Sequence, residues 1–165
     1  MQADPYGIDP CSRAVIVDAA AGVVRCEPKR NKVAIIGASP SSRRDAPWTD
    51  PDWEVWGINE IAQPRATRWF ELHPMAVQTS QELEWLSKCP TPCYVLSLHD
   101  VEPRLMTDRG VAAACLSVAN AVEYPLERVL KATGSRRYFT CTFAYQVALA
   151  VAEGFEEIGL WGVDL

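Results

Sequence analysis

Five short apolar runs along the chain are each followed within three residues by a polar side chain. The runs are VAIIG, WEVWGI, RWFEL, YVLSL and IGLW, which begin at residues 33, 53, 68, 94 and 158. Continuous apolar runs of this length are typical of strands buried on both faces, and the longer segments between them suit helical crossovers. The pattern predicts an α/β fold, namely a three-layer, Rossmann-like, mostly parallel sheet of about five strands with helices on both faces.

Helix signals lie between the runs. Ser39 suits an N-cap and Pro40 the first position of a short helix, which Pro47 ends. The most regular helical spacing of apolar residues covers Thr142–Glu153, and Gly154 stands where a left-handed C-cap belongs. The sequence therefore predicts one helix directly after the first strand and another directly before the last.

The middle of the chain is less regular. A capped start at residue 79 and a proline at residue 90 predict a helix between them, and residues 125–131 predict a short helix. Residues 104–122 fit either a helix or a mobile cover, and both alternatives stay open.

Two β-rich runs within residues 11–27 surround a turn of small residues and predict a hairpin. We therefore expect an N-terminal extension over residues 1–30, containing this β-hairpin, and a Rossmann-like domain over residues 31–165. The sequence stops at Leu165, directly after the last predicted strand. We expect a C-terminally incomplete domain that one more helix and strand would complete.

Composition narrows the class of partner. The chain has 165 residues, 48% of them hydrophobic, which is enough for one core. A net charge of -5 argues against duplex nucleic acid, because neutralising phosphates requires clustered Lys and Arg. Arg43-Arg44 and Arg136-Arg137 are ordinary surface or, alternatively, a site for one anionic ligand. Neither a leader peptide nor a long apolar stretch is visible, so we expect a cytoplasmic protein without membrane contact.

Six cysteines are present, and Cys89 and Cys93 are the only close pair. Their spacing falls within the range of zinc ligands, but no second pair or nearby histidine completes a set of four. We expect ordinary thiols in a reducing compartment and predict no metal site, and a metal or redox module at Cys89 and Cys93 is the weakest alternative.

Each predicted strand leads to side chains that can bind a ligand or act in catalysis. They lie at the edge where open α/β sheets bind ligands. The loop over residues 37–42 combines a glycine, small hydroxyls and a helix start, which suits a phosphate; a capped turn without ligand is the alternative. Asn59 and Glu60 follow the second strand and suit a base or ribose, or they cap the next segment. Thr142, beside Cys141, opens the longest predicted helix and suits the same crevice, or an N-cap alone.

Both histidines of the chain, His73 and His99, fall at predicted strand ends and suit acid–base chemistry. Asp100 and Asp164 suit a hydroxyl or a cap. The candidate catalytic residues are His73, His99 and Asp164, and the candidate ligand-binding residues are Gly37, Ser39, Ser41, Asn59, Glu60, Cys141 and Thr142.

The stretches VAIIGASPSS, WEVWGINE and YFTCTFAYQVALAVAEGFEEIGLWGVDL resemble the nucleotide-binding half of bacterial lipooligosaccharide sialyltransferases. They also resemble the related 6-hydroxymethylpterin diphosphokinase-like proteins, and they are similar to small bacteriophage proteins. The resemblance covers about half the chain. It implies that a cytidine nucleotide lies against Gly37, Ser39, Ser41, Asn59, Cys141 and Thr142. The phosphate-holding tyrosines and general-base histidine of that family follow the position of Asp164, where this sequence is almost at its end.

Two functions stay open. The first is a Rossmann-like protein of a glycosyltransferase-like or diphosphokinase-like lineage that binds a nucleotide or nucleotide-sugar. If it is an enzyme, we expect a transferase. A phage origin is one alternative for this protein. The second is a non-enzymatic phage accessory or ligand-sensing protein. The expected partner is a small nucleotide ligand, although the second function also allows protein contact, and an open sheet edge predicts a homo-oligomer.

Overall fold

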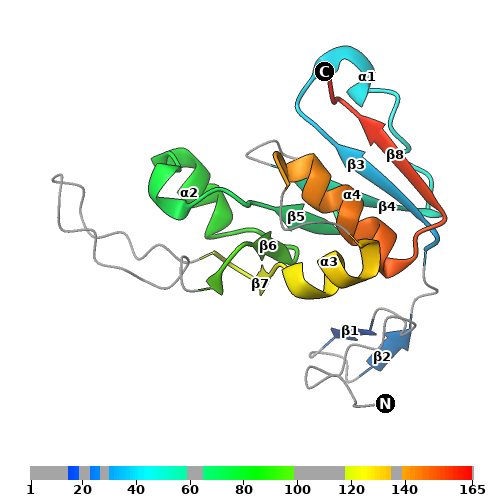
Figure 1. Cartoon of the computed structure of the whole chain (residues 1–165), viewed down its shortest axis with the longest axis horizontal. Helices are drawn as coiled ribbons and strands as arrows, with labels where there is room; N and C mark the ends of the chain where they lie inside the picture. Colours follow the sequence, from blue (N-terminus) through cyan, green and yellow to red (C-terminus); the bar gives the residue numbers. More distant parts are fainter. Residues whose placement is uncertain are drawn as a thin grey trace, which may run out of the picture.

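The computed structural model describes residues 15–18, 23–26, 30–58, 65–98, 118–134 and 139–164. Within these residues the main sheet has six strands, all parallel, in the order β7-β6-β5-β4-β3-β8 (Figure 1). The strands are β3 (Lys32–Ile36), β4 (Trp53–Ile58), β5 (Arg68–Phe70), β6 (Cys93–Val95), β7 (Ala121–Glu123) and β8 (Glu157–Trp161). The sheet confirms the predicted α/β class.

The strand order reverses direction at β3. From β3 the chain steps through β4, β5, β6 and β7 in turn, and then returns to place β8 on the other side of β3. A reversal of this kind leaves a crevice at the carboxyl ends of the two strands on either side of it. The topology therefore directs attention to the carboxyl ends of β3 and β8.

Helices cover both faces of the sheet. On one face, α3 (Leu126–Thr133) and α4 (Thr142–Glu153) lie side by side over a core that includes Val33, Trp56 and Leu149 (Figure 1). On the other face lie α2 (Ser80–Leu86), the short 3-10 helix η1 (Met75–Val77), and the segment after α1 (Pro40–Arg43). Alternate strand residues point to opposite faces, so the three-layer arrangement follows from the two-sided apolar runs.

Local sequence signals set the helix ends. Ser39 caps α1, accepting the Ser41 amide at 3.4 Å, and Pro40 holds the first helical position, as predicted. Thr79 and Glu82 form a capping box that opens α2. The α4 bounds agree with the prediction, and Gly154 ends the helix with a φ of 77°.

Two parts of the prediction need correction or completion. The sheet has a sixth strand, β7, that the sequence pattern does not reveal, because only three residues pair and two of them are exposed. At the N-terminus, β1 (Val15–Asp18) and β2 (Val23–Cys26) pair antiparallel, while the residues between them lie outside the described part of the chain. The hairpin as a whole therefore stays a prediction.

At the amino edge of the sheet, a cluster of charges joins α4 to β4 and β5. The Arg68 guanidinium lies 2.8 Å from Glu153 and 3.2 Å from Glu54, and stacks on the Trp56 ring at 4.8 Å. All three charged side chains are at least four-fifths buried, with exposed fractions of 20%, 17% and 16%. The cluster thus fixes the end of α4 against the sheet.

Candidate functional site

The loop after β3 and the end of β8 interlock at the carboxyl edge. The Gly37 amide donates to the Trp161 carbonyl at 2.7 Å, and the Ser39 amide donates to the Gly162 carbonyl at 2.9 Å. A Cβ on Gly37 would lie 2.2 Å from the Gly162 oxygen, and Gly162 itself has a φ of +68°. Glycine is therefore required at both positions, because the two backbones approach too closely for a Cβ. At Gly162 the positive φ adds a second reason.

Asp164 joins this junction to the β3 loop. Its carboxylate accepts a hydrogen bond from the Ser39 hydroxyl and another from the Ser41 hydroxyl, the latter at 2.5 Å. These two bonds lower the pKa of Asp164, because they stabilise the charged form. Residues more than 120 positions apart in the sequence thus form one hydroxyl–carboxylate cluster at the reversal of strand order, as the sequence pattern predicts for these three.

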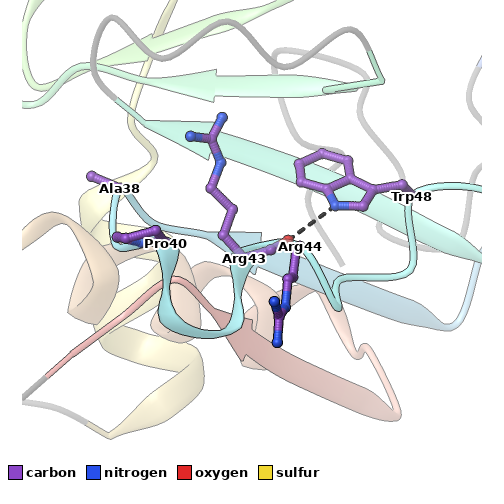
Figure 2. A pocket seen from close by; sticks show the side chains of 5 residues that line it. All are labelled: Ala38, Pro40, Arg43, Arg44 and Trp48. Atoms are coloured by element: carbon purple, nitrogen blue, oxygen red, sulfur yellow. Dashed lines mark hydrogen bonds between the residues drawn. The ribbon is translucent and has the colours of Figure 1, made fainter.

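A hollow of about 310 Å³ lies beside this cluster, lined by Ala38, Pro40, Arg43, Arg44 and Trp48 (Figure 2). The Arg43 side chain and the Trp48 indole lie on the same side of α1, whereas the Arg44 side chain points away from them (Figure 2). The indole nitrogen donates to the Arg43 carbonyl at 3.0 Å, and Arg65 donates to the Trp48 carbonyl, so the wall of the hollow is held in place. A guanidinium beside an indole suits a ligand that carries both an anion and a ring.

The start of α4 lies against the same junction. The Phe143 ring is 3.0 Å from the position that a Cβ on Gly37 would take, which places Cys141 and Thr142 close to the end of β3. Cys141 is exposed and lines a second hollow of about 560 Å³, formed mostly by apolar side chains of α4 and β8. Cys141 thus borders an apolar surface, in contrast to the charged hollow at Arg43.

His73 lies at the carboxyl end of β5 with a partner that the sequence pattern conceals. Its Nδ1 is 2.7 Å from the Glu71 carboxylate, which also accepts the His73 amide at 3.1 Å. The Glu71 side chain is only 3% exposed, while that of His73 is 57% exposed. With Nδ1–H donated to Glu71, Nε2 is left to accept a proton or a hydrogen bond. Glu71 lies inside the mostly apolar run RWFEL, so the sequence pattern does not mark it as a site residue. The only sequence signal for its contact with His73 is their spacing of two residues.

The predicted site residues are thus only partly brought together. Ser39, Ser41 and Asp164 form one cluster, Gly37 contacts Gly162 at the same junction, and Cys141 and Thr142 begin the adjacent helix. His73 is two strands from β3, which corresponds to about 10 Å at the usual strand spacing. Asn59, Glu60, His99 and Asp100 lie outside the described residues.

The described residues contain no group of three or more His, Cys, Asp or Glu side chains arranged to hold a metal ion. None of their helices has the length and apolar character needed to cross a bilayer. The chain matches no protein-family model, no curated protein and no solved structure. We therefore infer function from the fold and from the geometry of the site.

Proposed function

We propose that this chain binds a nucleotide or nucleotide-sugar at the carboxyl ends of β3 and β8, as a Rossmann-like protein of glycosyltransferase-like lineage. The observation that carries the proposal is the hollow at Arg43 and Trp48, which lies next to the reversal of strand order. Parallel sheets bind ligands at such reversals, and the lining offers a guanidinium for a phosphate and an indole for a base.

In the proposed complex the Arg43 guanidinium binds phosphate oxygens and the Trp48 indole packs against the base. Guanidinium–phosphate hydrogen bonds are among the stronger ones in proteins, and stacking is tolerant of base identity. Asp164 then accepts a ribose or sugar hydroxyl. An ionised carboxylate already bonded to Ser39 and Ser41 suits a hydroxyl donor better than a second anion.

This assignment moves the phosphate from the two serines to Arg43. A phosphate at Ser39 and Ser41 would meet the Asp164 charge at hydrogen-bonding distance, which is repulsive. The serines instead hold Asp164 in position, and the assignment of Asn59, Glu60 and Thr142 to the ligand stays a prediction.

A ligand-sensing protein without catalysis is the second candidate. The described residues that favour it are His73 and Asp164, because these two candidate acid–base groups follow strands β5 and β8, which are three apart in the sheet order. A transferase would need them, or His99, at one reacting centre. Single-turnover assays with nucleotide-sugars separate the two candidates, since the sensing protein binds the ligand and returns it unchanged.

Calorimetry with a panel of nucleotides and nucleotide-sugars tests binding. We expect at least one ligand with a Kd well below about 1 mM, and an Arg43→Ala variant with affinity about tenfold weaker. Lys88→Ala is the control, because it removes the same charge from an exposed side chain that does not line the hollow and should retain binding. Absence of binding across the panel, or equal losses in both variants, would contradict the proposal.

A homo-oligomer in the cytoplasm is also proposed. β8 forms an edge of the described sheet and presents Leu160 with an exposed fraction of 50%. A second copy would remove such an edge from solvent. Light scattering coupled to size exclusion tests this, and a strictly monomeric profile would contradict it.

A further inference from the structure

His73 and Glu71 form a pair that the proposed binding of a nucleotide does not involve. The Glu71 side chain is almost fully buried, with an exposed fraction of 3%, whereas the His73 side chain is 57% exposed. Nδ1 of His73 lies 2.7 Å from Oε1 of Glu71. A buried carboxylate is therefore in contact with an imidazole ring that is accessible from solvent.

The backbone around the pair is held in place. The His73 amide donates to the same Glu71 oxygen at 3.1 Å, and the Glu71 amide donates to the Tyr94 carbonyl of β6 at 2.9 Å. Directly after His73, Pro74 leads into η1, whose Met75 is buried. The chain is thus fixed on both sides of His73, which limits the positions that its ring can take.

The contact with Glu71 decides which nitrogen of the neutral ring carries the proton. An ionised carboxylate only accepts hydrogen bonds, so Nδ1 donates and Nε2 keeps its lone pair. The two nitrogens point in different directions from the ring, so Nε2 points away from Glu71. His73 therefore presents an unprotonated nitrogen at the carboxyl end of β5, the edge at which parallel sheets bind ligands.

We propose that His73 is a phosphoryl-acceptor site, with Nε2 as the nucleophile and Glu71 as the residue that positions the ring. Nε2 attacks the terminal phosphorus of a phosphoryl donor, the bond from that phosphorus to the leaving oxygen breaks, and the leaving group departs with the electron pair. The ring then carries a positive charge, which the Glu71 carboxylate stabilises through the Nδ1 proton. Attack of water on the phosphohistidine phosphorus later releases inorganic phosphate and restores the neutral ring.

We expect a nucleoside triphosphate as the donor, and this choice of donor rests on the proposed function. β5, which leads to His73, lies two strands from β3, or about 10 Å at the usual strand spacing. An extended nucleoside triphosphate is longer than this separation, so a donor bound in the hollow at Arg43 and Trp48 is long enough to bridge it. The covalent step itself goes beyond the proposed function, because ligand binding does not require His73.

Peptide mapping of the wild-type protein tests the proposal with two donors. ATP with magnesium requires a nucleotide site, whereas acetyl phosphate does not. Cleavage after Arg68 and Lys88 gives one peptide, residues 69–88, in which His73 is the only histidine. With at least one donor, we expect this peptide to gain a phosphate that acid removes and alkali does not, and phosphorus-31 NMR to identify the Nε2 isomer. Absence of this phosphate with both donors would overturn the proposal, and so would attachment at Nδ1.

Rates with acetyl phosphate separate a built site from the ordinary reactivity of imidazole. In the folded chain we expect His73 to react at least about tenfold faster than His99, the only other histidine, and about tenfold faster than His73 does in urea. Glu71→Gln keeps an acceptor for Nδ1 but removes the charge, and should slow the reaction about tenfold. If Glu71→Gln fails to fold, the comparison of folded and urea-treated wild type still decides. Equal rates at the two histidines would overturn the proposal.

The outcomes distinguish this site from the proposed nucleotide site. Phosphorylation of His73 by acetyl phosphate, without nucleotide binding in calorimetry, would support the phosphoryl-acceptor site and contradict the proposed function. Nucleotide binding in calorimetry, with His73 unmodified by both donors, would support the proposed function and overturn the phosphoryl-acceptor site.

Discussion

At the amino edge of the sheet an arginine is enclosed by two carboxylates, whereas at the carboxyl edge an exposed carboxylate is held by two serine hydroxyls. The Arg68 cluster is mostly buried, and each charge has an opposite charge in contact. The Asp164 cluster is open to solvent and lies next to a hollow. Buried ion pairs are costly to break, whereas exposed polar contacts contribute little to stability. We infer that the amino edge maintains the fold and the carboxyl edge is available for a ligand.

Arg68→Ala gives the largest expected effect on stability. It leaves Glu54 and Glu153 without their shared partner in mostly buried positions. We expect the free energy of unfolding to fall by about 3 kcal/mol, measured by urea denaturation. A surface control is Lys88→Ala, which removes an exposed ion pair with Glu84 and should change stability by under about 0.5 kcal/mol. Similar losses for the two variants would contradict the structural role of the amino edge.

Gly162→Ala has the next largest effect and acts at the carboxyl edge. Its Cβ would lie 2.7 Å from the Gly37 carbonyl oxygen, at a φ of +68°. We expect a loss of about 3 kcal/mol or less from strain and steric contact together, seen in thermal unfolding.

Gly134→Ala is the matched comparison for that loss. Its φ is +63°, but nothing lies within 4 Å of an added Cβ. It should cost about 1 kcal/mol, which isolates the backbone contribution. Equal losses at the two glycines would show that the close contact between the β3 loop and β8 has no energetic weight.

The smallest expected effect is the pH dependence of Asp164. Hydrogen bonds from Ser39 and Ser41 lower its pKa in the folded state, so the folded chain binds fewer protons there than the unfolded chain. This stability is present in full above about pH 4, near the pKa of an unfolded aspartate, and is lost as pH falls through the lower folded value.

Carbon-detected NMR titration of the Asp164 carboxyl tests this effect. We expect the double variant Ser39→Ala, Ser41→Ala to raise the pKa toward that of an ordinary aspartate, because both donors are removed. An unchanged pKa of Asp164 in the variant would show that the hydroxyls do not hold the carboxylate.

Elements whose signals are local in sequence could be predicted, and sites built from distant residues only in part. The α4 bounds follow from its own apolar spacing and from Gly154, and α1 follows from Ser39 and Pro40. Ser39, Ser41 and Asp164 could be grouped because parallel strands align their carboxyl ends. In contrast, β7 offers three residues of weak pattern, and its pairing with β6 depends on a contact across the fold.

Three residues near the site could not be assigned to it from the sequence, because their contacts join distant parts of the chain. Glu71 lies in an apolar run, and only the structure shows that its carboxylate lies 2.7 Å from the His73 Nδ1. The sequence shows Arg43 as one of a basic pair and Trp48 as a residue suited to packing. Their position around one hollow depends on how the chain after α1 folds back, which no local spacing encodes.

Amide NMR mapping during a nucleotide titration tests the central claim most directly, namely that the ligand site lies where β3 and β8 end. The account predicts the largest saturable shifts at residues 37–48 and 162–164, with small shifts around Arg68 at the amino edge. Saturable shifts centred on Arg68, Glu54 and Glu153 would contradict it, as would the absence of shifts at the β3–β8 junction for every nucleotide that binds.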